Sequence, residues 1–210
     1  MATIVTEPFL STFIHIPKTG GNSITNWLNE NTKSQVTKRR QHATVEEVCQ
    51  GNHSLGPINR EDLGLTWCVV RNPWDYCASW YSFQIMLCEF YIRQIHKHPE
   101  MKNNRKEKWN LQVQENKLKR LKNGFVPWLN QTGISSMHSW AKDCDKILKL
   151  ENISKDFKFI QDKMHCWKPL GHDNKTINRK KYQEYYTSQE AIDLVAKKFK
   201  IDIETYGYDF

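Results

Sequence analysis

The chain contains no apolar run long enough to cross a membrane, and its N-terminus does not have the pattern of a secretory signal peptide. Its six cysteines form no CxxC pair and no spacing typical of a zinc site. Several of them lie in apolar segments, as free core cysteines do. We therefore expect reduced thiols, no metal and a cytoplasmic location. The alternative is an isolated domain of a lumenal protein.

The length and composition indicate a folded protein that meets an anionic partner. A chain of 210 residues suggests one domain, and 39% hydrophobic with 12% aromatic residues favours a packed core over disorder. The net charge is +8 and the isoelectric point is about 9.1. Such a basic chain is expected to bind nucleic acid, a membrane surface, or an anionic cofactor or substrate.

The positive charge is concentrated in one segment. Between Arg93 and Lys122 there are ten Lys or Arg residues and three Glu residues, which leaves a local charge of +7. A run of this kind is typical of a solvated helical face. The alternative is an electropositive rim that attracts an anionic acceptor.

The segment from Ile14 to Ser23 is the first with a chemical signature. Residues 12–16 are mostly apolar and predict a short buried strand that Pro17 ends. Gly20 and Gly21 permit a tight turn and a close approach to a ligand, and a helix capped by Asn22 or Ser23 follows. A strand, a glycine loop and a helix N-terminus together suit a phosphate or sulfate group.

This loop does not match the phosphate-binding loop of nucleotide hydrolases, because Lys18 precedes the two glycines instead of following them. The order Pro-Lys-Thr-Gly-Gly-x-Ser resembles the loop of sulfotransferases that use 3′-phosphoadenosine 5′-phosphosulfate (PAPS). The resemblance implies that the loop holds the 5′-phosphosulfate and that Lys18 is catalytic. The cofactor-binding residues implied are Pro17, Lys18, Thr19, Gly20, Gly21, Asn22 and Ser23. An ordinary glycine turn is the alternative.

Residues 65–70 predict a second buried strand, which is followed by Arg71. Open α/β sheets bind ligands at the carboxyl ends of their strands. A kinase would be expected to carry an acidic Mg²⁺ ligand after such a strand, but this chain has Arg71 there. The sequence therefore predicts an anion site that works without a metal.

The string from Val69 to Asp75, with Ser79 after it, resembles the second sulfotransferase signature. In that family the corresponding Arg and Ser bind the 3′-phosphate of PAPS, which implies this role for Arg71 and Ser79. Arginine suits phosphate because its planar guanidinium can donate two hydrogen bonds. The alternative is that Arg71 pairs within the fold and that Ser79 is a helix spacer.

A third segment, residues 171–176, is a polar loop that resembles an Asn-Lys-Ser/Thr segment of the family. The resemblance implies that Lys175 and Thr176 lie near the cofactor phosphates and that a helix with Tyr182, Tyr185 and Tyr186 follows. A plain surface loop is the alternative.

The remaining pattern predicts the following elements: a loose lead-in over 1–10, a capping box formed by Thr44 and Glu47, helices over 75–98 and 105–122, a strand over 146–150, a helix capped by Ser154, and a last helix over 188–200 with a capping box formed by Thr187 and Glu190.

These observations predict an α/β fold: a single domain over 1–210 with a P-loop-like parallel β-sheet core flanked by helices, the sulfotransferase fold. Residues 84–137 are expected to form a helical, basic insertion that faces the acceptor. Since no membrane anchor is seen, the resemblance implies a bacterial or viral member, or an isolated catalytic domain.

The function implied is sulfuryl transfer from PAPS to a hydroxyl of a glycan or small molecule, with adenosine 3′,5′-bisphosphate (PAP) as the product. A histidine is the expected general base, with His42 first, His53 second and His15 third. No nucleic-acid partner is expected in this interpretation. Two other interpretations remain: a nucleotide-binding, kinase-like protein, and a nucleic-acid-binding protein that uses the 93–122 face.

Overall fold

The computed structural model describes residues 2–37, 42–51, 56–98, 105–171 and 180–210, except for the side chains of Arg105 and Glu107. The chain divides into two compact units. The first contains Met1–Asn72, Ser135–Lys175 and Ile201–Asp209, and the second contains Pro73–Ile134, Thr176–Lys200 and Phe210.

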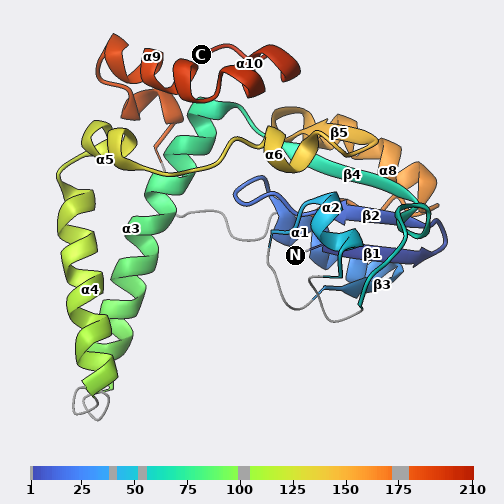
Figure 1. The fold of residues 1–210 in the computed structure, drawn as a ribbon, viewed down its shortest axis with the longest axis horizontal. Coiled ribbons are helices and arrows are strands. Elements are labelled where there is room, and N and C mark those ends of the chain that lie inside the picture. The colour runs from blue at the N-terminus through green and yellow to red at the C-terminus, as the bar shows by residue number, and fades with distance from the viewer. Residues whose placement is uncertain (1, 38–41, 52–55, 99–104, 172–179) are drawn as a thin grey trace. The chain divides into compact units, whose positions relative to one another are not determined.

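The first unit is built on a five-stranded sheet with the strand order β3-β1-β2-β4-β5 (Figure 1). The strands are β1 (Ala2–Glu7), β2 (Ser11–Ile14), β3 (Lys33–Val36), β4 (Leu65–Val70) and β5 (Lys146–Lys149). Strands β2, β4 and β5 are parallel, whereas β1 is antiparallel to both of its neighbours, β2 and β3.

The sheet is therefore mixed, and the prediction of a parallel sheet is correct only for β2, β4 and β5. The prediction of a loose lead-in over residues 1–10 is wrong, because β1 forms a hairpin with β2. Ala2, Ile4 and Val5 are buried in the core. This short strand was missed because its first four residues are all buried, so the period-2 alternation of a half-exposed strand is absent.

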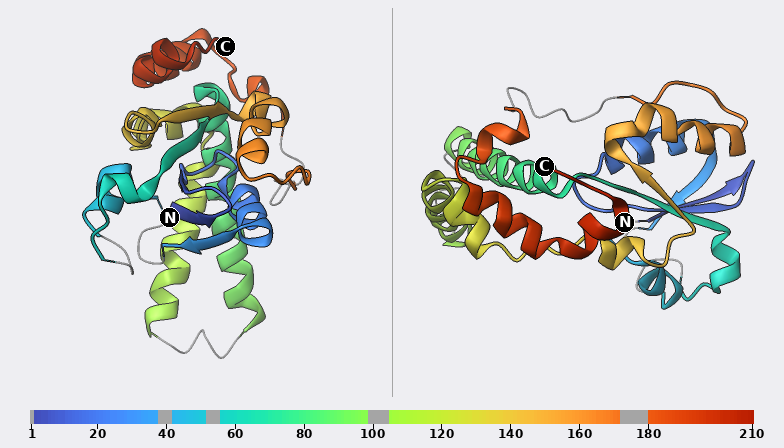
Figure 2. Two further views of the ribbon diagram at one scale, coloured as in Figure 1. Left: turned by 90° about the vertical axis from the view of Figure 1, so that its right-hand side faces the viewer. Right: turned by 90° about the horizontal axis from the view of Figure 1, so that it is seen from above.

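Helices cover both faces of the sheet (Figure 2). One face is covered by α1 (Gly21–Asn31), α7 (Ile153–Asp156) and α8 (Lys158–Lys163), which enclose an aromatic core. In this core Trp27 packs edge-on against Phe157. The ring centroids of Phe13 and Trp67 are 4.6 Å apart. On the other face lie α2 (Val45–Cys49) and α6 (His138–Ala141), and α6 packs against β4.

Short helical segments complete this unit: η1 (Arg60–Leu63), η3 (Leu150–Asn152) and α10 (Lys200–Tyr206). The predicted capping box before α2 is confirmed, since Thr44 Oγ1 accepts from the Glu47 N–H at 3.1 Å and Glu47 Oε2 accepts from the Thr44 N–H at 3.1 Å. The predicted cap at Ser154 is wrong, because the chain is already helical at Ile153.

The second unit is helical. It consists of α3 (Pro73–Lys97), α4 (Arg105–Lys122), α5 (Phe125–Gln131), η4 (Tyr182–Tyr185) and α9 (Gln189–Lys198). Helices α3 and α4 lie side by side as a hairpin, and both match the helices predicted over 75–98 and 105–122 (Figure 1). Tyr81, Phe125 and Tyr186 form the aromatic core, with ring centroids 5.4 Å apart for Tyr81–Phe125 and 4.9 Å apart for Phe125–Tyr186.

The last predicted helix begins one residue later than expected. Ser188 is the N-cap of α9, and its hydroxyl accepts from the Ala191 N–H, so the predicted capping box of Thr187 and Glu190 is wrong. Among the described residues, no helix has both the length and the apolar character needed to cross a membrane.

Candidate functional site

The loop after β2 has a backbone conformation that is unusual for its sequence. Lys18 has a φ of 64° and Gly20 a φ of 80°, so both are left-handed. This conformation costs a non-glycine residue about 1–2 kcal/mol. Thr19 is fully buried between them, and its hydroxyl donates to the Ile16 carbonyl at 2.9 Å. The loop is thus closed by an internal hydrogen bond, with the half-buried Lys18 at its turn.

Helix α1 begins directly after this loop. Gly20 is its N-cap, and no side chain caps the first turn among the described residues. The expectation that Asn22 or Ser23 is the cap is therefore wrong, because the left-handed Gly20 starts the helix one to two residues earlier. The first turn also contains no acidic residue. A helix N-terminus of this kind presents N–H groups and a positive dipole end to an anion.

Gly21 is required by close packing. A Cβ atom at this position would lie 2.1 Å from the ring of His15, which is far inside van der Waals contact. His15 follows β2 and is 5% exposed. The imidazole therefore occupies the space that any larger residue at position 21 would need. The second glycine of the motif fixes how closely α1 approaches the end of β2.

Arg71 connects the segment after β4 to the glycine loop after β2. It follows β4, and because β2 and β4 are parallel neighbours, the loops after them lie at the same edge of the sheet. Arg71 is 9% exposed, and its Nη1 donates to the Lys18 carbonyl oxygen at 2.9 Å. The same guanidinium therefore supports the left-handed turn at Lys18 and adds a second cation to this edge.

Glu151 is a part of this edge that sequence reasoning missed. It lies in η3, directly after β5, and its Oε1 accepts from the Asn72 N–H at 2.6 Å. Its Oε2 accepts from the Tyr208 hydroxyl at 3.1 Å, and burial, together with this carboxylate, raises the pKa of Tyr208. The carboxylate thus fixes the residue that follows Arg71. The available signal was the position of Glu151 at the end of a predicted strand.

A hydrogen bond to the backbone of His15 holds His42 next to the glycine loop. Its Nδ1 is 2.9 Å from the His15 carbonyl oxygen, and its own carbonyl accepts from Trp140 Nε1 at 2.7 Å. Because a carbonyl oxygen only accepts, Nδ1 of His42 carries the proton, and Nε2 of the neutral ring keeps its lone pair. Burial lowers the pKa of His42, although the bond to His15 opposes this. His42 is therefore held neutral and oriented, as a general base must be.

His15 differs from His42 in its degree of burial. Desolvation, reinforced by His42, lowers the pKa of His15 to about 3. The two rings meet edge to face with centroids 5.0 Å apart. His15 is thus neutral at physiological pH and packs against the start of α1.

The other predicted site residues differ in burial and in the unit to which they belong. Pro17 is buried and Asn22 is exposed, whereas Ser23 is buried in the first turn of α1. Ser79 is buried at 6% exposure on α3 and belongs to the second unit. His53, Lys175 and Thr176 lie outside the described residues, so their assignments stay predictions.

The edge of the sheet therefore combines three features that suit an oxyanion, namely the α1 N-terminus, Lys18 and Arg71, with a neutral His42 at the same loop. Among the described residues, no group of three or more His, Cys, Asp or Glu side chains is arranged to hold a metal ion. Comparisons with protein-family models, with curated proteins and with solved structures found no match to this chain.

Proposed function

We propose that this protein transfers the sulfuryl group of PAPS to a hydroxyl of an acceptor. The observation that carries the proposal is the hydrogen bond from Arg71 to the Lys18 carbonyl. It joins the two segments that resemble the phosphosulfate and 3′-phosphate loops of sulfotransferases. The proposal includes a sulfotransferase fold built on the mixed sheet and a carbohydrate or small-molecule acceptor.

In this proposal the donor is held by the loop and by Arg71. The N–H groups at the start of α1 bind the 5′-phosphate, and Arg71 binds the 3′-phosphate with its planar guanidinium. Ser79, Lys175 and Thr176 keep the phosphate-binding roles that the resemblance implies. A dedicated 3′-phosphate contact distinguishes PAPS from ATP.

The reaction proposed is an in-line displacement at sulfur. The acceptor oxygen forms a bond to sulfur while the bond between sulfur and the bridging oxygen of PAPS breaks. The leaving PAP takes that electron pair, and Lys18 stabilises the developing negative charge. The proton of the acceptor hydroxyl goes to Nε2 of His42. No metal ion takes part in this scheme.

The test is direct transfer. The purified protein is incubated with PAPS and a set of mono- and oligosaccharides and small alcohols, and PAP release and the gain of one SO₃ group by the acceptor are followed by mass spectrometry. We expect His42→Gln to lower turnover by about 10²- to 10⁴-fold while PAP still binds. No PAP release with any acceptor, or turnover that is unchanged in both His42→Gln and Lys18→Gln, would contradict the proposal.

A further inference from the structure

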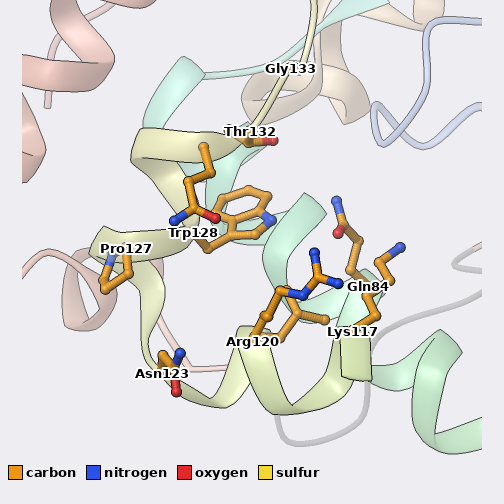
Figure 3. Close-up of a pocket in the computed structure, with 10 residues that line it drawn as sticks. Gln84, Lys117, Arg120, Asn123, Pro127, Trp128, Thr132 and Gly133 are labelled. Carbon is orange, nitrogen blue, oxygen red and sulfur yellow. The ribbon is translucent and has the colours of Figure 1, made fainter. Parts of the chain in front are cut away.

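The helical unit contains a cavity of about 400 Å³ between α3, α4, α5 and the segment after α5 (Figure 3). This volume lies in the range of small-molecule sites. None of the residues that line the cavity is among those assigned above to the donor. Its lining combines two cations, several amides and one tryptophan.

The cations are Lys117 and Arg120 of α4. They are three residues apart on one helix, so their side chains leave the same face. Figure 3 shows them next to each other at the cavity, with Gln84 of α3 beside them. Within the described part of the chain, neither forms an ion pair with an acidic side chain. Two adjacent cations without a protein counterion favour an anionic ligand.

The neutral lining adds a second requirement. The amides of Gln84, Asn123 and Gln131 each offer both donors and an acceptor, which is the pattern that a ligand hydroxyl needs. Trp128 is 9% exposed and contributes an apolar surface. Its ring lies 5.3 Å from Tyr81 and 5.6 Å from Phe125 between centroids, so the surrounding core holds it rigidly. A simple inorganic anion would use the cations and leave this amide and indole lining unused.

We propose that this cavity binds a monosaccharide-sized anion with several hydroxyl groups, that is, a sugar acid or a sugar phosphate. Lys117 and Arg120 hold the anionic group, the three amides hold the hydroxyls, and the C–H face of the ring packs against Trp128. The proposal does not depend on sulfuryl transfer, because it rests only on residues of the helical unit.

The test is an NMR titration of the full chain labelled with ¹⁵N. The indole N–H signal of Trp128 is assigned by its loss in Trp128→Phe, and the ligands are D-glucuronate and D-glucose 6-phosphate, with D-glucose and inorganic phosphate as references. We expect at least one sugar anion to move this signal and to bind at least 10-fold more tightly than both references. The tighter of the two identifies the anionic group as carboxylate or phosphate.

Charge variants complete the test. Lys117→Gln and Arg120→Gln are each expected to weaken the sugar anion about 10-fold, whereas Lys119→Gln, an exposed residue of the same helix, leaves it unchanged. Three results would overturn the proposal: no shift of the Trp128 signal, inorganic phosphate binding as tightly as the sugar anions, or an equal loss in Lys119→Gln. PAP binding, measured in parallel, reports separately on the proposed transferase.

Discussion

The guanidinium of Arg71, after β4, donates a 2.9 Å hydrogen bond to the carbonyl oxygen of Lys18, in the loop after β2. The two residues are 53 positions apart in the sequence. Their contact fixes a left-handed turn and gathers two positive charges at one edge of the sheet.

Arg71 is expected to act through both its charge and its shape. Arg71→Ala should weaken PAP binding about 10- to 100-fold, since hydrogen bonds to charged groups contribute about 1.5–3 kcal/mol. Arg71→Lys keeps the charge but loses the planar fork, so we expect an intermediate loss. Isothermal titration calorimetry measures both. The matched control is Arg60→Lys, whose side chain pairs with Asp145 at the opposite end of β4. An equal loss in this control would contradict the assignment of Arg71.

Replacing Lys18 with glycine is expected to raise the stability of the protein and to lower its turnover. Lys18→Gly removes both the side chain and the cost of a left-handed non-glycine residue, so the free energy of unfolding should rise by about 0.5–1 kcal/mol. Lys18→Gln removes only the charge. Both variants should lose about 10²- to 10³-fold in turnover with PAPS. Urea unfolding and a PAP-release assay measure the two effects, and a variant that keeps normal turnover would exclude Lys18 from catalysis.

Gly21 and His15 are expected to be coupled. Gly21→Ala should cost about 2–3 kcal/mol of unfolding free energy, because its Cβ would overlap the His15 ring. In a His15→Ala background the space is vacant, so the same change should cost about 1 kcal/mol or less. Denaturant unfolding of the four proteins gives this double-mutant cycle. Gly133→Ala is the control, since a Cβ there would meet nothing within 4 Å. Equal costs of Gly21→Ala in the two backgrounds would show that the His15 ring does not exclude a larger residue at position 21.

The histidine pair predicts a loss of stability in mild acid. The pKa of His15 is about 3 in the folded protein and 6.5 in the unfolded chain, so the unfolded chain binds the extra proton between these values. The stabilisation is therefore complete above about pH 6.5 and declines as the pH falls toward 3, and the lowered pKa of His42 acts in the same direction. Urea midpoints measured from pH 7.5 to 5 should fall more steeply for the wild type than for His15→Gln. Parallel curves would show that His15 does not titrate as described.

Local sequence patterns predicted the elements with strong periodicity or capping chemistry. Helices α3 and α4 and the box of Thr44 and Glu47 follow from side chains that are neighbours in the sequence. Strand β1 could not be read in this way. It pairs with β2 over residues 2–5 and with β3 from Thr3 to Glu7, and its buried residues give no alternation.

The candidate site was only partly readable for the same reason. The types and order of Lys18, Gly20, Gly21 and Arg71 indicated an anion site, since each carries its chemistry in its own side chain or backbone freedom. The role of Glu151 depends on contacts with Asn72 and Tyr208, which are distant in the sequence. The proton on Nδ1 of His42 likewise depends on the carbonyl of His15, 27 residues away.

Calorimetric titration of the wild type with PAP and with ADP, each in the presence and absence of Mg²⁺, tests most directly whether this edge of the sheet is a PAPS site. We expect PAP to bind equally well with and without Mg²⁺ and at least 10-fold more tightly than ADP, and Arg71→Ala to remove this preference. Tighter binding of ADP with Mg²⁺, or no binding of either nucleotide, would contradict this expectation.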